Sequence, residues 1–136
     1  MPSIAGKYEH YKNENLDEYF AACGLPYVVR KMISLITPIM EIILEDDVMT
    51  LRVTSWLWSS DHTFKLGEKY IEQMPKDNII SVTKVVNDHE VLTESVIEST
   101  GDKAHRHYLF TDEEVVETLT HEKAKGVTKR YYKRIK

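Results

Sequence analysis

The closing stretch of the chain, KGVTKRYYKRIK at residues 125–136, carries six lysine and arginine side chains, although the formal net charge of the protein is -4. Such clustering first suggests a basic tail that binds a polyanion. In an extended conformation, however, Arg130 and Tyr132 would share one face, whereas Lys129 and Tyr131 would take the other. The β-branched and aromatic residues of the stretch favour a strand over a tail. Which face is buried then depends on the rest of the chain.

The region that precedes this strand consists of short apolar or alternating runs, separated by turn-forming clusters such as EDD, MPKDN, NDHE and STGDK. This pattern is typical of a meander of antiparallel strands. A long up-and-down sheet leaves an exposed edge unless it closes, so the predicted fold class is an all-β antiparallel barrel that can enclose one small ligand. The expected strands are 6–11, 39–44, 48–58, 62–66, 69–73, 79–86, 90–98, 104–110, 114–121 and 127–135.

Two short helices are expected between the first two strands. In ENLDEYFAACG, Asn15 is the predicted N-cap, Glu18 holds the capping-box position, and Gly24 suits a left-handed residue after the helix. A second helix is expected to begin at Pro26 as its first residue and to stop before Pro38. The apolar stripe of the first helix is formed by Leu16, Tyr19, Phe20 and Cys23.

Length and composition predict one globular domain spanning residues 1–136, with 42% hydrophobic and 29% charged residues. The acidic balance argues against nucleic acid as a partner. Cys23 is the single cysteine, and the N-terminus lacks the apolar run of a signal peptide, so we expect a reducing, cytoplasmic location. No apolar run approaches the roughly 20 residues of a membrane-spanning helix.

Five segments carry a resemblance to a known family: GKY at 6–8, ENLDEYFAACG at 14–24, TFKLGEKY at 63–70, HRHYL at 105–109 and RYY at 130–132. In this order and spacing, the chain resembles an intracellular lipid-binding protein of the fatty-acid-binding branch over essentially its whole length. The resemblance implies a flattened ten-stranded up-and-down barrel, or clam shell, capped by a helix-turn-helix. It also implies a monomeric, non-enzymatic carrier that holds a long-chain fatty acid without a cofactor or a metal.

The family holds the ligand carboxylate with an arginine and a tyrosine two residues later in the last strand, together with an arginine two strands earlier. The resemblance places these roles on Arg130, Tyr132 and Arg106. Physical chemistry agrees, because buried guanidinium groups are costly unless paired, and their planar fork suits a carboxylate. The residues expected to line the cavity along the alkyl tail are Leu16, Phe20, Pro38, Met40, Leu51, Val53, Ser55, Leu57 and Leu119.

Glu117 departs from the family pattern, because it matches a wall position that is apolar in relatives. We predict an inward carboxylate that lies close to Arg106, neutralises it, and leaves Arg130 as the uncompensated cation. A slip of one residue in the preceding hairpin would instead turn Glu117 to solvent and put Val116 and Thr118 inside. A second departure is Tyr8, which stands where relatives usually carry tryptophan at the base of the barrel.

Several residues also allow other interpretations. His105 and His107 have a spacing seen among metal ligands, but both would face outward if Arg106 faces inward, and no third ligand is evident. Cys23 could act as a nucleophile, yet its place on an apolar helix stripe favours an ordinary buried thiol. The sequence therefore predicts neither a metal site nor an enzyme.

Two alternative functions remain within non-enzymatic lipid binding. One is a carrier of another hydrophobic ligand, such as a retinoid. The other is a membrane-docking lipid-transfer protein, in which Arg30, Lys31 and the outward lysines of the last strand touch anionic headgroups.

Overall fold

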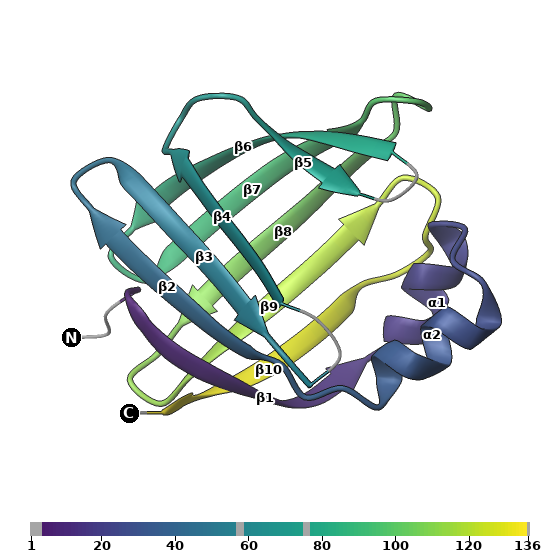
Figure 1. The fold of residues 1–136 in the computed structure, drawn as a ribbon, viewed down its shortest axis with the longest axis horizontal. Helices are drawn as coiled ribbons and strands as arrows, with labels where there is room; N and C mark the ends of the chain where they lie inside the picture. The colour runs from purple at the N-terminus through teal and green to yellow at the C-terminus, as the bar shows by residue number, and fades with distance from the viewer. Residues whose placement is uncertain (1–3, 57–58, 75–76, 136) are drawn as a thin grey trace.

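The computed structural model describes residues 4–56, 59–74 and 77–135, which form a ten-stranded antiparallel barrel with two helices at one end (Figure 1). Both chain termini lie at the opposite end (Figure 1). The strands are β1 Gly6–Glu14, β2 Ile39–Glu45, β3 Val48–Thr54, β4 Ser59–Lys65, β5 Tyr70–Met74, β6 Asp77–Asn87, β7 Glu90–Ile97, β8 Lys103–Phe110, β9 Glu114–His121 and β10 Thr128–Ile135. The helices α1 Leu16–Ala22 and α2 Tyr27–Ser34 connect β1 to β2.

The strands follow the order β4-β3-β2-β1-β10-β9-β8-β7-β6-β5, so the two terminal strands pair with each other in the middle of the sheet. In the described part of the chain, β4 and β5 are the unpaired ends of this order. The rings of Phe64 on β4 and Tyr70 on β5 stack across this opening with centroids 4.1 Å apart. The barrel is therefore nearly closed, which confirms the predicted fold class.

The largest error in the expected strand boundaries lies between β3 and β4. The apolar run after Val48 predicted a strand as far as residue 58, but β3 ends at Thr54 and β4 begins at Ser59. Thr54 pairs with Ser59 in the antiparallel ladder, and residues 57 and 58 of the expected strand lie outside the described part of the chain. The pairing of β3 with β4, rather than local strand propensity, sets where β3 ends.

The start of α1 also differs from the expected capping box. Asn15 is the N-cap, as predicted, but it has a left-handed φ of 58° and makes no side-chain cap hydrogen bond, so the capping box expected with Glu18 does not form. Its side-chain amide instead donates to the carbonyl of Val127 at 3.1 Å, and its own carbonyl accepts a hydrogen bond from Thr128 at 3.1 Å. These bonds tie the helix to β10. Pro26 is the N-cap of α2 rather than its first residue.

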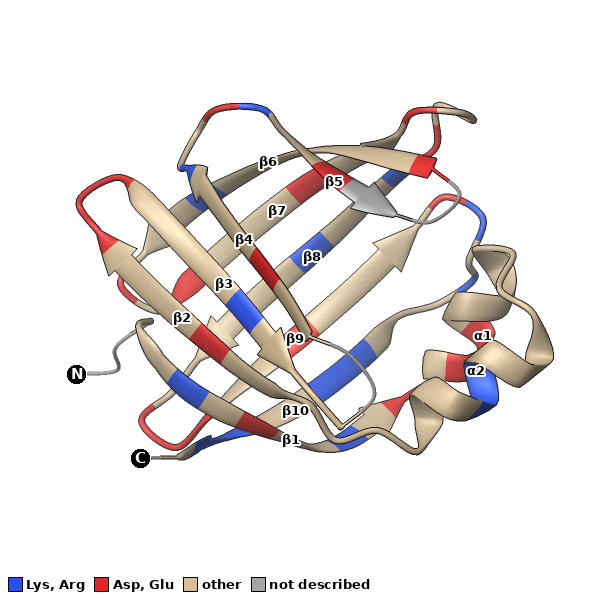
Figure 2. Cartoon of the chain, viewed as in Figure 1, with Lys and Arg blue, Asp and Glu red and all other residues tan. Residues whose placement is uncertain are grey.

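The outer face of β1 and β10 holds cations against tyrosine rings, among them Lys133 of the basic closing stretch. The ammonium group of Lys133 lies 5.0 Å from the centre of the Tyr11 ring, and that of Lys12 lies 5.1 Å from the Tyr131 ring. Tyr11 donates a hydrogen bond to Glu114, which raises the pKa of the Tyr11 hydroxyl to about 12. Lys133 therefore faces outward, as the strand alternation predicts. Figure 2 shows charged residues spread over most strands and an acidic turn between β2 and β3.

The main core lies between the barrel walls at the end that holds the termini. Tyr8, fully buried, packs edge-on against Phe110 with ring centroids 5.7 Å apart, and its hydroxyl donates to the carbonyl of Ile4 at 2.9 Å. The expected aromatic at the barrel base is thus present as tyrosine. The other buried members of this cluster are Met40, Ile42, Met49, Phe64, Val91, Tyr108, Val115 and Tyr132.

Replacing Tyr8 by phenylalanine is expected to lower the free energy of unfolding by about 1 kcal/mol, because a buried carbonyl loses its hydrogen-bond donor while the ring packing remains. Urea denaturation of the two proteins measures this difference. Tyr27→Phe is the matched control, since Tyr27 is 65% exposed and its loss of a hydroxyl should be neutral. Equal stabilities for Tyr8→Phe and Tyr27→Phe would contradict a structural role for the Tyr8 hydroxyl.

Candidate functional site

An ion pair spans the inside of the barrel between β8 and β5. The Nη2 atom of Arg106 donates to both carboxylate oxygens of Glu72 at 2.9 Å, and the hydroxyl of Ser81 donates to the same carboxylate at 2.8 Å. Glu72 is 5% exposed. Two strands separate β5 from β8 in the sheet, so this contact crosses the interior rather than following a ladder. Arg106 faces inward as predicted, and its charge is already compensated.

The environment of Arg106 indicates unfilled space inside the barrel. Burial opposes its charge, but the neighbouring Tyr108, Glu72 and Glu117 outweigh that effect and raise the pKa of its guanidinium. Deep as it lies, 23% of its side chain remains accessible. A desolvated group with accessible surface must face internal space rather than packed side chains. The interior is therefore not completely filled at the level of Arg106.

Arg130 lies on the inner face of β10 in a different electrostatic situation. Its Nε atom donates to the side-chain oxygen of Asn13 at 3.1 Å, and its guanidinium carbon lies 5.8 Å from the centre of the Tyr132 ring. Among the described residues, no carboxylate oxygen lies within 4.0 Å of its guanidinium. Arg130 is thus the interior cation without an acidic partner, as predicted.

A β-bulge makes this arrangement possible. The pairing of β1 with β10 shifts register between His10 and Lys12, so that His10 and Asn13 both reach the inner face. His10 contacts Asn13 at 2.6 Å and packs edge-on against Tyr132 with ring centroids 5.4 Å apart. Burial lowers the pKa of His10, so a neutral imidazole is favoured.

Glu117 faces the interior and is 7% exposed, which excludes the alternative register. The Tyr132 hydroxyl donates to its carboxylate at 3.4 Å, and Glu117 is the cross-strand partner of Arg130 on one side and of Tyr108 on the other. Glu117 is one of the charges that raise the pKa of the Arg106 guanidinium, but the ion pair of Arg106 is formed with Glu72, a partner that the sequence did not predict. The direct neighbour of Arg106 on β9 is Leu119.

The interior wall is polar on one side and apolar on the other. Hydroxyl pairs connect β6 to β7, with Ser81 and Ser95 at 2.8 Å and Thr83 and Thr93 at 2.7 Å, and Tyr70 bonds to Thr83 at 2.8 Å. The facing strands β2 and β3 supply aliphatic side chains, including Met40, Ile42, Met49, Leu51 and Val53. An amphipathic interior of this kind accommodates an elongated apolar molecule with a polar end.

The residues expected to contact an alkyl tail fall into three groups. Pro38 and Met40 are buried, and Leu51, Val53 and Ser55 are half-buried. Leu16, Phe20 and Leu119 form a separate apolar cluster with Tyr19 beneath the helices. Leu57 lies outside the described residues.

Sequence reasoning missed Glu72, Asn13 and the hydroxyl pairs. Alternation in SVT at 81–83 and TES at 93–95 was the available signal for the hydroxyls, because it puts them on one face. Glu72 follows the matched segment TFKLGEKY by two residues and shares a face with Tyr70. Nothing in the local sequence indicates that its partner is Arg106.

The rival sites find little support in the described residues. His105 lies 3.9 Å from Glu94 and His107 lies 2.9 Å from Glu90, and no cluster of three or more potential metal ligands occurs in the described part of the chain. Burial raises the pKa of the half-buried Cys23 thiol, which is unfavourable for a nucleophile. None of the described helices is long and apolar enough to span a membrane.

A nearly closed ten-stranded barrel with a helical cap and inward arginines defines the class of intracellular lipid-binding barrels. The chain is 30% identical to a fatty acid-binding protein of Tyrophagus putrescentiae over 98% of its own length and 99% of that protein. It belongs to the fatty-acid-binding branch of the intracellular lipid-binding protein family, whose members are non-enzymatic lipid carriers. No family profile matches the chain.

Solved structures of fatty acid-binding proteins share the fold of this chain. A fatty acid-binding protein from Drosophila melanogaster brain shares 32% identity and a TM-score of 0.85, with 96% of this chain and 99% of that chain covered. A Schistosoma mansoni fatty acid-binding protein in complex with arachidonic acid superposes with a TM-score of 0.88 at 21% identity, with 98% of this chain and 96% of that chain covered. At 21% identity, the similarity to the Schistosoma mansoni protein shows a shared fold.

Proposed function

We propose that the protein binds one long-chain fatty acid inside the barrel and carries it through the cytoplasm as a single-domain monomer. The observation that supports this most directly is Arg130, an inward guanidinium without an acidic partner among the described residues, beside the buried hydroxyl of Tyr132. Burying a cation without a counter-charge is costly, so an inward, half-buried arginine of this kind favours an anion. The relative bound to arachidonic acid supports the ligand class.

The proposed pose follows from the two kinds of wall. The ligand carboxylate contacts the Nη atoms of Arg130, which have no hydrogen-bond partner among the described residues, and the Tyr132 hydroxyl, while Arg106 stays paired with Glu72. The alkyl tail runs along the aliphatic side chains of β2 and β3, of which Leu51 and Val53 are half-buried. Each buried methylene contributes about 0.8 kcal/mol before ordering costs.

Native mass spectrometry of the purified protein, followed by solvent extraction, tests this proposal. We expect a mass increment of one fatty acid per chain, or stoichiometric displacement of a fluorescent fatty acid by oleate from the delipidated protein. An empty barrel that fails to bind the fluorescent fatty acid would contradict the proposal. A retinoid in the extract would identify the alternative ligand class.

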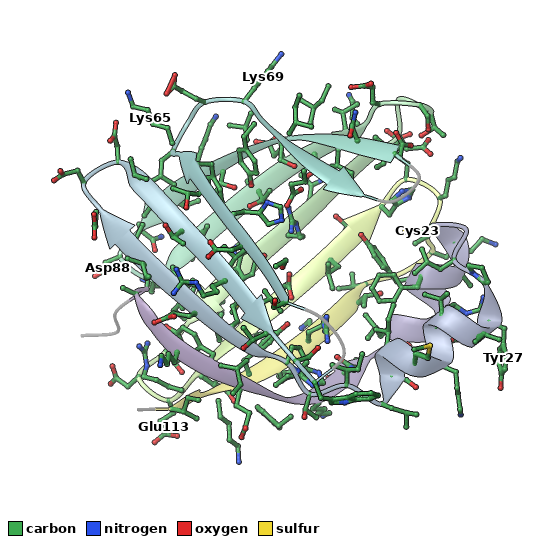
Figure 3. All side chains as sticks on the ribbon, viewed as in Figure 1. Cys23, Tyr27, Lys65, Lys69, Asp88 and Glu113 are labelled. Carbon is green, nitrogen blue, oxygen red and sulfur yellow. The ribbon has the colours of Figure 1, made fainter. Side chains whose placement is uncertain are left out.

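A second candidate, membrane-docking transfer, is favoured by the exposed apolar side chains of α2. Tyr27, Val28 and Leu35 are 65%, 67% and 69% exposed, and Tyr27 extends from the helix into solvent (Figure 3). Lys31 on the same helix supplies a positive charge. An amphipathic helix with exposed apolar residues and a cation suits the surface of an anionic membrane.

Transfer of a fluorescent fatty acid from the protein to anionic vesicles is therefore expected to accelerate in proportion to vesicle concentration. Val28→Ser should slow this transfer severalfold, because it removes apolar area from the docking face without touching the interior. Val86→Ser is the matched control, since Val86 is 55% exposed on β6, away from the helices. A transfer rate independent of vesicle concentration would leave simple diffusional release as the mechanism.

A further inference from the structure

We propose that Glu117 determines headgroup specificity: the site selects lipids whose headgroup donates a hydrogen bond, such as a primary fatty amide, and takes up a proton when it binds a fatty acid. This inference rests on the proposed function, since it assumes that the headgroup lies at Arg130 and Tyr132. It adds a residue to that site and a second class of ligand.

The position of Glu117 places it in contact range of that headgroup. Glu117 is the direct cross-strand partner of Arg130, and its carboxylate accepts a hydrogen bond from Tyr132, the second anchor of the site, at 3.4 Å. Its side chain is 7% exposed and shares the inner face of β9 with Val115 and Leu119. A molecule that touches both Arg130 and Tyr132 therefore lies beside the Glu117 carboxylate.

The acceptor capacity of Glu117 is only partly used. An ionised carboxylate has about four lone-pair sites, and Glu117 accepts hydrogen bonds from two tyrosines, Tyr108 and, at a long 3.4 Å, Tyr132. Within the described residues neither interior cation forms an ion pair with it, since Arg106 binds Glu72 and Arg130 binds Asn13. A buried carboxylate with acceptor sites left over favours a ligand that brings a further donor.

The ionisable groups around Glu117 come from four elements. Arg130 and Tyr132 face it from β10, Arg106 and Tyr108 from β8, Tyr19 from α1, and His10 from β1. The three tyrosines are buried, and burial, with Glu117 as a further contributor, raises their pKa values, so they remain neutral donors near pH 7. The neutral form of His10 is favoured as well. Among these groups, Glu117 is the one carboxylate.

Ligand chemistry follows from this arrangement. A fatty-acid carboxylate at Arg130 would place two carboxyl groups side by side in a buried site, where they cannot both stay ionised, so the pair holds one proton. A primary amide avoids this requirement. Its carbonyl oxygen accepts from Arg130 while its N–H donates to Glu117, and no proton is taken up.

The test is isothermal titration of oleate and of oleamide into the delipidated protein at pH 8, in two buffers with different ionisation enthalpies. For the wild-type protein we expect uptake of about one proton per oleate and none per oleamide. Glu117→Gln should abolish the proton uptake, tighten oleate binding by at least tenfold, and weaken oleamide binding by about fivefold. Glu94→Gln is the matched control, because Glu94 faces outward on β7, and it should leave the affinity and proton uptake of both ligands unchanged.

Glu117→Leu puts an apolar side chain at this wall position and should also tighten oleate binding. It serves as the second variant if Glu117→Gln folds poorly. Oleate binding without proton uptake, together with unchanged affinities in both variants, would overturn the role of Glu117 and leave the proposed fatty-acid function intact. Weaker oleate binding in Glu117→Gln would also overturn it. Failure of both lipids to bind the wild-type protein would overturn this inference and the proposed function together.

Discussion

Glu72→Gln is expected to lower the free energy of unfolding of the ligand-free protein by about 2 to 3 kcal/mol. The substitution leaves the buried Arg106 without the carboxylate that forms its ion pair, and breaking a buried ion pair from one side is costly. The effect stays below the roughly 5 kcal/mol upper range for fully buried pairs, because 23% of the Arg106 side chain remains accessible. Urea denaturation followed by tryptophan fluorescence measures the loss.

The double variant Glu72→Gln/Arg106→Gln should recover most of this stability, since neither member of the ion pair is left charged without the other. Glu41→Gln is the matched control: Glu41 pairs with Arg52 at 3.3 Å on the outer face, where an ion pair contributes at most about 1 kcal/mol. If Glu72→Gln and Glu41→Gln cost the same, the interior pair has no special role in stability. Freed from Glu72, Arg106 should also attract the ligand carboxylate and tighten fatty-acid binding.

Arg130→Gln is expected to weaken fatty-acid binding by about 1.5 to 3 kcal/mol, the range for a charge-assisted hydrogen bond, and to leave binding of a fatty alcohol nearly unchanged. Arg106→Gln should have a smaller direct effect on the ligand, because Glu72 already compensates Arg106. Displacement of a fluorescent fatty acid by oleate and by oleyl alcohol gives both affinities for each variant.

Lys129→Gln is the matched control for Arg130→Gln, because it removes one positive charge from the adjacent, outward position of β10. A comparable loss in this control would mean that the general field of the basic strand, rather than a direct contact, attracts the ligand. Equal losses for oleate and oleyl alcohol in Arg130→Gln would mean that Arg130 supports the barrel and does not recognise the headgroup.

The family motif predicted the three residues that anchor the ligand carboxylate, but not the residues that these three contact. Arg106, Arg130 and Tyr132 were expected on the inner face, and strand alternation puts them there regardless of detail elsewhere. Their partners could not be predicted in the same way. Asn13 reaches Arg130 through a bulge in β1, and Glu72 reaches Arg106 from the edge strand β5, which two strands separate from β8.

The sequence by itself determined the ten-strand meander, the helix pair and the inward face of the strands that carry the matched segments. Side-chain alternation and turn residues set these features, and both depend only on residues a few positions apart. The sequence left two registers open for Glu117, one with its side chain inside and one with it in solvent, and the structure has it inside. Only the tertiary structure decided which carboxylate compensates which arginine. That choice depends on curvature, register and distances across the barrel, and residues 34 positions apart in sequence, such as Glu72 and Arg106, become neighbours only when the sheet closes.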